Sequence, residues 1–255
     1  MSVRIFLSGC NGRMGKTIRA IAAEQDGLSI VAGSDIQTDP ACPFPIYQEP
    51  QMCQEDFDVL IDFSNPAAFN HVCQLIEKCH CPAVICTTGL EQDMKDRLLD
   101  LSKASPIFMS ANMSLGINLL IGLARQAAAL LYPEYNIEII EAHHNQKVDA
   151  PSGTALMIAE QINDALSGQL NLVTDRSQTR NKRDPAELGI HAIRGGNIVG
   201  EHTVLFAGPE ENITIHHSAQ SRAVFARGAL AAARFLTGKP AGFYSMTDLI
   251  AERKP

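Results

Sequence analysis

The sequence is short of positive charge. Its 255 residues hold 21 lysines and arginines against 28 aspartates and glutamates, which gives a net charge of −7. An acidic chain is a poor candidate for binding nucleic acid or an anionic membrane surface. We therefore expect no nucleic-acid or membrane partner, and look for a small-molecule function in one or two ordinary soluble domains.

The sequence also lacks an uninterrupted apolar run that could span a bilayer. The most apolar stretch, residues 115–132, is broken by Asn118, Arg125 and Gln126 and stopped by Pro133. Because a membrane helix needs about 20 consecutive apolar residues, this stretch predicts a buried helix. No signal peptide is visible before the first predicted strand, so we expect a cytoplasmic protein.

Paired cysteine motifs are missing as well. All seven cysteines fall within the first 86 residues, their number is odd, and no CxxC pair occurs. Reduced, buried thiols in a cytosolic protein account for this pattern most simply. Cys79-His80-Cys81 resembles half of a zinc site, but no second ligand pair follows at metal spacing, so we expect no metal.

The first part of the chain alternates strands with helices. The predicted strands are Val3–Ser8, Ser29–Asp35, Val59–Phe63, Ala83–Thr87 and Ile107–Ser110, and the predicted helices are Met14–Glu24, Pro66–Lys78, Glu91–Ser105 and Leu115–Tyr132. Such alternation predicts an α/β domain in which helices cover a parallel, Rossmann-like sheet.

After Tyr135 the pattern changes. It gives a strand, a helix, a long polar loop after Leu166 and three further strands, which are Asn136–Ala142, Ala155–Leu166, Gly189–Arg194, Glu201–Ala207 and Asn212–Ser218. This order predicts a second, smaller α+β domain. The pattern alone does not assign the last predicted helix, Ala223–Leu236, to either domain.

A glycine-rich turn follows the first predicted strand and opens the first predicted helix. It reads GCNGRMG and comprises Gly9, Cys10, Asn11, Gly12, Arg13, Met14 and Gly15. Such a turn brings backbone N–H groups against a pyrophosphate, which a side chain would block. Asp35 closes the second strand about twenty residues on, where a carboxylate binds the adenosine ribose. The context predicts a dinucleotide site.

A second group of chemically useful residues lies in the segment EAHHNQKVDAPSGTA, residues 141–155. Neighbouring side chains of a strand point to opposite faces, so we expect His143 and His144 to differ in role. Lys147 follows in a loop, and residues 151–154 open a helix. The backbone N–H groups of Gly153 and Thr154 at this helix start would form an anion site, which predicts binding of a carboxylate or phosphate beside a proton donor.

These motifs resemble those of the 4-hydroxy-tetrahydrodipicolinate reductase family, nicotinamide-dependent enzymes of the diaminopimelate route to lysine. The resemblance covers nearly the whole chain and includes GCNGRMG, DFSNP, TTG, SANMSLGIN, EAHHNQKVDAPSGTA, RGGNIVGEHTV and AQSRAVFARGAL. It implies that a dinucleotide-binding domain spans residues 1–114 and 223–255, with a substrate-binding and oligomerisation domain over residues 115–222. It further implies a homotetramer.

The resemblance also implies roles for individual residues. His143 is expected to supply a proton to the reduced ring of a small dicarboxylate, with Lys147 assisting. The expected substrate-binding residues are His144, Ser152, Gly153, Thr154 and Arg222. Besides the glycine turn and Asp35, the expected cofactor contacts are Cys86, Thr87, Thr88, Ser110, Ala111, Asn112 and Met113.

Cofactor choice should depend on Asp35 and its neighbour. The carboxylate would repel a ribose 2′-phosphate, and family members that use NADPH well often carry arginine at the next position. Here that position is Ile36. Arg13 could still supply a positive charge, so we expect NADH to be preferred and NADPH to be tolerated.

Two other functions are compatible with a two-domain dinucleotide-binding chain. One is a different NAD(P)-dependent dehydrogenase, such as an amino-acid dehydrogenase, against which the segment 141–155 argues. The other is a non-catalytic redox sensor, which would bind NADH without consuming it.

Overall fold

The computed structural model describes residues 2–39, 41–178 and 180–253. They divide into two compact units, one within Met1–Leu115 and Ala223–Pro255 and the other comprising Gly116–Arg222. The sequence-based boundaries, 114/115 and 222/223, differ from this division by one residue at the first boundary. Each unit is described by itself below.

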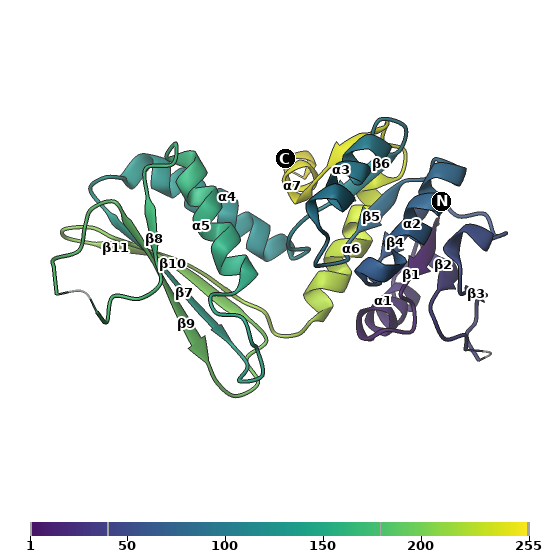
Figure 1. Cartoon of the computed structure of the whole chain (residues 1–255), viewed down its shortest axis with the longest axis horizontal. Helices are drawn as coiled ribbons and strands as arrows, with labels where there is room; N and C mark the ends of the chain where they lie inside the picture. Colours follow the sequence, from purple (N-terminus) through teal and green to yellow (C-terminus); the bar gives the residue numbers. More distant parts are fainter. Residues whose placement is uncertain (1, 40, 179, 254–255) are drawn as a thin grey trace. The chain divides into compact units, whose positions relative to one another are not determined.

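The first unit is built on a seven-stranded parallel sheet (Figure 1). Its strands are β1 (Val3–Ser8), β2 (Leu28–Ser34), β3 (Ile46–Tyr47), β4 (Val59–Asp62), β5 (Ala83–Ile85), β6 (Pro106–Met109) and β12 (Gly242–Tyr244). Their spatial order is β12-β6-β5-β4-β1-β2-β3. The chain thus leaves β1 toward β2 and then returns to β4 on the other side of β1. Ligands of such sheets bind at this reversal, outside the carboxyl ends of the strands.

Helices cover both faces of this sheet because successive residues of its strands alternate between two apolar cores. Ile5 and Leu7 of β1 face the core formed with helices α1 (Arg13–Ala23) and α6 (Ala223–Leu236). Phe6, between them, faces the core formed with α2 (Phe69–Cys79) and α3 (Gln92–Leu101). Three short helices complete the unit: the 3-10 helices Pro50–Met52 and Pro66–Ala68, and α7 (Met246–Glu252).

The second unit is a five-stranded mixed sheet with two helices over one face (Figure 1). Its strands are β7 (Asn136–His143), β8 (Asn171–Val173), β9 (Glu187–Arg194), β10 (Glu201–Ala207) and β11 (Asn212–Ser218), in the order β11-β10-β7-β9-β8. The helices are α4 (Leu115–Leu131) and α5 (Gly153–Ala165). Alternate residues of the central strands, such as Ile137 and Ile139, are buried against them.

The predicted fold, a Rossmann-like α/β domain with a smaller α+β domain, is confirmed. The strand ends at the site differ slightly from the predicted ones. Strand β2 stops at Ser34, before Asp35, β5 stops at Ile85, and β7 continues through His143. Beyond the predicted elements the structure contains β3, β8, β12 and α7. All four are short, and strands of two or three residues carry too little periodicity to be read from sequence.

All seven cysteines are free thiols, but the prediction that they are buried is only partly right. Cys10, Cys53, Cys73 and Cys81 are buried, whereas Cys42 and Cys86 are partly exposed and Cys79 is exposed. Within the described ranges, the helices are all too short or too polar to cross a membrane.

Candidate functional site

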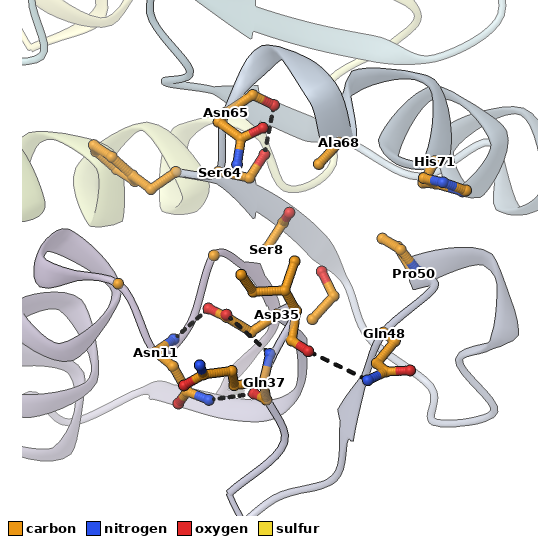
Figure 2. A pocket seen from close by; sticks show the side chains of 15 residues that line it. Ser8, Asn11, Asp35, Gln37, Gln48, Pro50, Ser64, Asn65, Ala68 and His71 are labelled. Carbon is orange, nitrogen blue, oxygen red and sulfur yellow. Dashed lines mark hydrogen bonds between the residues drawn. The ribbon is translucent and has the colours of Figure 1, made fainter.

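A cavity of about 390 Å³ lies in the first unit at the carboxyl ends of β1, β2 and β4 (Figure 2). Gly9, Asn11, Gly12 and Asp35 line one side of it, as the sequence predicts for a dinucleotide site. The cavity therefore coincides with the point where the strand order reverses.

The glycine turn is held so tightly that two of its glycines are indispensable. Gly9 has φ of +75°, and a Cβ there would lie 2.5 Å from the carbonyl oxygen of Phe63, at the end of β4. A Cβ on Gly15 would lie 2.2 Å from the carbonyl oxygen of Gly9. Since α1 begins at Arg13 without a side-chain cap, the N–H groups of its first turn are not bound by a capping side chain, an arrangement that suits an anion.

Asp35 stabilises this turn through hydrogen bonds to backbone N–H groups. Its Oδ2 accepts a hydrogen bond from the backbone N–H of Asn11 at 2.9 Å, and its Oδ1 accepts one from Gln37 N–H at 3.4 Å. The Asn11 side chain in turn donates to the carbonyl oxygen of Gln37 at 2.7 Å (Figure 2). Ile36 also lines the cavity and is 81% exposed.

The opposite side of the cavity was not anticipated. It is formed by Gln48 after β3, by Pro50 at the start of the first 3-10 helix, and by Ala68 and His71 of the helical segments after β4 (Figure 2). No motif marks these residues, because only the folding of the chain brings the two segments to one cavity.

The remaining predicted cofactor residues lie at the same edge of the sheet without lining this cavity. Cys86, Thr87 and Thr88 follow β5, and Ser110, Ala111, Asn112 and Met113 follow β6. The Thr87 hydroxyl donates to the buried Asp62 at 2.7 Å. Cys10 and Met14 pack in or against the core, and Arg13 is exposed at the start of α1.

In the second unit, two of the predicted residues, His143 and Ser152, bond a carboxylate that was not predicted as part of the site, that of Glu141. Glu141 is fully buried on the helix-covered face of the sheet. It accepts hydrogen bonds from Arg194 at 2.8 and 2.7 Å and from the Ser152 N–H at 3.0 Å, and it bonds His143 Nδ1 at 2.6 Å. Burial alone would raise the pKa of Glu141, but these hydrogen bonds outweigh it and lower the pKa.

His143 also contacts His202 of β10. Their rings meet edge to face with centroids 5.2 Å apart, and His202 Nε2 lies 3.2 Å from the Ser152 hydroxyl. Burial, followed by the proximity of His143, lowers the pKa of His202 to about 4. His202 is therefore neutral at physiological pH and adds no charge to the site.

Lys147 lies in the loop after β7 and pairs with Asp149 at 2.8 Å. Its hydrogen bond lowers the pKa of Asp149, whose side chain is 59% exposed. Such exposed pairs contribute only about 0–1 kcal/mol. The ammonium group could therefore exchange Asp149 for another carboxylate at little cost.

His144 occupies a different position from His143, as expected. It lines a cavity of about 350 Å³ together with Gln146, Asn197, Val199 and Arg222. The structure thus brings two predicted substrate residues, His144 and Arg222, into one hollow. Lys147, Gly153 and Thr154 do not line it.

Helix α5 begins at Gly153, two residues before the predicted Ala155, and ends at Ala165, one residue before the predicted Leu166. Ser152 is its N-cap, and its hydroxyl oxygen accepts the N–H of Ala155 at 3.1 Å. Gly153 is exposed, and a Cβ there would meet no atom within 4 Å. The helix start is therefore open on the Gly153 side to an incoming group.

Glu141, Arg194 and His202 were missed as site residues. Glu141 could have been found, because it lies two residues before His143 on a strand and must share its face. Arg194 and His202 could not, because their positions depend on strand register. Arg194 pairs with His143 across β7 and β9, and His202 pairs with Glu141 across β7 and β10.

Comparison with known families covers nearly the entire chain. The family model described as "Dihydrodipicolinate reductase, N-terminus" matches residues 3–113, and the model described as "Dihydrodipicolinate reductase, C-terminus" matches residues 116–250. The first matched segment lies within the first unit, whereas the second covers the whole second unit and continues through residues 223–250 of the first.

Individual relatives agree with the family models. A protein named 4-hydroxy-tetrahydrodipicolinate reductase from Caldanaerobacter subterraneus subsp. tengcongensis is 50% identical over 250 residues, covering 98% of this chain and 99% of that protein. One of the same name from Clostridium novyi is 46% identical, with 98% and 99% covered. The solved structure of dipicolinate-bound dihydrodipicolinate reductase from Paenisporosarcina sp. TG-14 has a TM-score of 0.81 at 24% identity, covering 96% of this chain and 98% of that chain, which shows a shared fold.

Proposed function

Because the chain belongs to the dihydrodipicolinate reductase family and is an NAD(P)H-dependent oxidoreductase of lysine biosynthesis, we propose that His143, Lys147 and the start of α5 carry the substrate half of its reaction. The reaction reduces the hydroxylated or dihydro form of dipicolinate to tetrahydrodipicolinate. The alternatives of another dehydrogenase and of a non-catalytic sensor are not favoured by these relatives.

One observation supports this assignment above the others. The carboxylate of Glu141 bonds both His143 and the N–H of Ser152, so the expected proton donor and the anion-binding helix start share one anchor. Reduction of a conjugated imine ring leaves electron density that must take up a proton. Histidine suits this step because its unperturbed pKa of about 6.5 lies near the working pH.

The substrate is a small dicarboxylate, and the second unit offers several groups for its two charges. The backbone N–H groups of Gly153 and Thr154 start α5, where an anion is favoured. Ser152 holds the geometry of this helix start through its cap. Lys147, His144 and Arg222 add side-chain donors, so both carboxylates can be neutralised.

The cofactor residues fit a pyridine nucleotide. The glycine turn is folded so tightly that a Cβ at Gly9 or Gly15 would clash with neighbouring backbone, and such a turn presents backbone N–H groups to a pyrophosphate. When bound, the nicotinamide supplies the hydride, and the protein contributes position and charge. Asp35 is placed beside the turn, with its carboxylate at the cavity where a ribose would lie.

We expect NADH to match or exceed NADPH in catalytic efficiency, and Ile36→Arg to improve the use of NADPH. Asp35 repels a 2′-phosphate, and the exposed Ile36 offers it no charge. A guanidinium at position 36 could pair with the phosphate through two hydrogen bonds. Because the side chain is exposed, the gain should be about 1 kcal/mol, or about fivefold.

The measurement is kcat/KM with both cofactors for wild type and Ile36→Arg, with Ile36→Gln as the uncharged control. The glutamine variant should leave the preference nearly unchanged. A strong preference of the wild type for NADPH would contradict the role given to Asp35 and would point to Arg13.

We propose that the chain forms a homotetramer through the sheet of the second unit. The face of this sheet turned away from α4 and α5 carries Ile140, Leu205 and Ile193, and Ile193 is 51% exposed. Light scattering after gel filtration should give about four times the chain mass of 27.6 kDa, and Ile193→Asp should lower it, since an unpaired buried charge is costly. A monomeric wild type would rule this out.

A cytoplasmic location is proposed on the ground that all seven cysteines are free, as expected in a reducing compartment. The reductase activity is tested by following NADH oxidation in the presence of dihydrodipicolinate synthase, pyruvate and aspartate semialdehyde. Oxidation should require all three additions. NADH that binds but is not consumed would instead indicate a sensor.

A further inference from the structure

We propose that Glu141 and Arg194 are positioning residues that make Nε2 of His143 the only nitrogen able to deliver the proton. The proposal rests on the proposed function of His143 as the acid. Neither residue would touch the substrate. Both would act through the imidazole ring.

Both oxygens of the Glu141 carboxylate are engaged in hydrogen bonds. Arg194 donates to both of its oxygens, Nη1 to Oε2 at 2.8 Å and Nη2 to Oε1 at 2.7 Å. The Ser152 N–H also donates a hydrogen bond to Oε1 at 3.0 Å, and His143 Nδ1 lies 2.6 Å from Oε2. A carboxylate bonded by an arginine fork and a backbone N–H is held ionised, in agreement with its lowered pKa.

The bond to Glu141 fixes the tautomer of the His143 imidazole. An ionised carboxylate can only accept hydrogen bonds, so a nitrogen 2.6 Å away must carry a hydrogen. His143 Nδ1 therefore stays protonated whether the ring is neutral or charged. Only Nε2 gains and loses a proton, and the ring cannot flip without breaking its bond to Glu141.

Nε2 of His143 lies beside Gly200. A Cβ at Gly200 would lie 3.1 Å from this nitrogen, closer than most side-chain contacts. A glycine at this position thus leaves Nε2 without a crowding side chain. The ring also packs edge to face on His202, which limits its tilt.

Arg194 has a second connection that links the ring to the loop carrying Lys147. Its Nη2 also donates to the carbonyl oxygen of Asp149 at 2.7 Å, and Asp149 pairs with Lys147. One guanidinium therefore orients the carboxylate behind His143 and holds the loop of the second donor. Loss of Arg194 should disturb both.

The charged and titratable groups around His143 come from the strands of the second sheet and from the loop after β7. Glu141 contributes the negative charge in contact with the ring, and Arg194 balances it on β9. His202 and His217, on β10 and β11, have lowered pKa values chiefly because of burial and are neutral. Lys147, near enough to lower the pKa of His202, is paired with Asp149.

The same strand provides a matched control. Glu138 of β7 also bonds an arginine and a histidine, with Arg183 Nε at 2.8 Å and His191 Nε2 at 2.8 Å. These two hydrogen bonds of Glu138 involve neither the start of α5 nor a predicted substrate residue. Glu138→Gln and Glu141→Gln therefore remove similar networks, only one of which should affect proton delivery.

The experiment compares the pH dependence of kcat and the KM values of the two variants. Glu141→Gln should lower kcat at least about tenfold, and no more than the loss of His143 itself, which is worth about 10²–10⁴-fold. The alkaline limb of its kcat profile should move to lower pH by about one unit, since an opposite charge no longer favours the protonated ring. KM for NADH should stay the same. Glu138→Gln should show none of these changes.

Nitrogen NMR of histidine-labelled wild type reads the tautomer of His143 in the unaltered protein. The signals of His143 are assigned by their loss in His143→Asn. In the neutral ring, hydrogen on Nδ1 is expected, and hydrogen on Nε2 would overturn the proposal. An unshifted pH profile in folded Glu141→Gln would overturn it as well.

These results separate the proposal from the function on which it rests. If His143→Ala turned over normally, the assignment of the acid would fail, whatever the tautomer. If His143→Ala lost activity while Glu141→Gln retained its kcat and pH profile, only the positioning role would fail.

Discussion

Replacing His143 with alanine is expected to lower kcat by about 10²–10⁴-fold, the usual contribution of a positioned acid. His143 is partly buried at the end of β7 and held through Nδ1 by Glu141. Alanine has no group that could deliver a proton from this position. The affinity for NADH should not change, since the dinucleotide cavity is lined entirely by residues of the first unit.

The control is His191→Ala, which removes another histidine bonded to a glutamate of β7. It should retain normal turnover. The measurements are steady-state kinetics and NADH binding by fluorescence, with the oligomeric state checked in each variant. Normal turnover of His143→Ala would mean that the acid has been assigned to the wrong residue.

Replacing Gly153 with aspartate should abolish most of the affinity for pyridine-2,6-dicarboxylate, a planar mimic of the substrate. The new carboxylate would stand at the helix start where a ligand carboxylate binds. Like charges placed together in a binding site cost several kcal/mol, so a loss of about 100-fold or more is expected. The fold should tolerate the change because a Cβ at Gly153 meets no atom within 4 Å, and an acidic residue suits the first turn.

Gly153→Asn separates charge from bulk, because its side chain has nearly the same size without the charge. Its loss of affinity should be clearly smaller. Calorimetric titration of wild type and both variants gives the comparison. Equal affinity of wild type and Gly153→Asp would exclude the start of α5 as a carboxylate site.

The sequence alone predicted the long elements of the fold well. Strands such as Val3–Ser8, Glu201–Ala207 and Asn212–Ser218 and the helix Ala223–Leu236 have the predicted bounds. Their alternation or helical spacing extends over enough residues to be unambiguous. The short strands β3, β8 and β12 were missed, since their pairing with longer strands, and not their own sequence, defines them.

The site was predictable only where its residues are close in sequence. The glycine turn and the segment 141–155 each concentrate their chemistry in one stretch, and Gly9 and Asp35 do line one cavity. Arg194 of β9, His202 of β10 and Gly200 just before β10 come near His143 from 50 or more residues away, through sheet register that no local pattern encodes. Pro50 and His71 similarly reach the nucleotide cavity through folding alone.

The most direct test of the central claim is a crystal structure of this protein with NADH and pyridine-2,6-dicarboxylate. The account predicts one ligand carboxylate within hydrogen-bonding distance of the N–H groups of Gly153 and Thr154. It also predicts that Nε2 of His143 faces the ring while Nδ1 remains on Glu141. A dicarboxylate bound away from α5, or a His143 ring turned so that Nε2 meets Glu141, would contradict it.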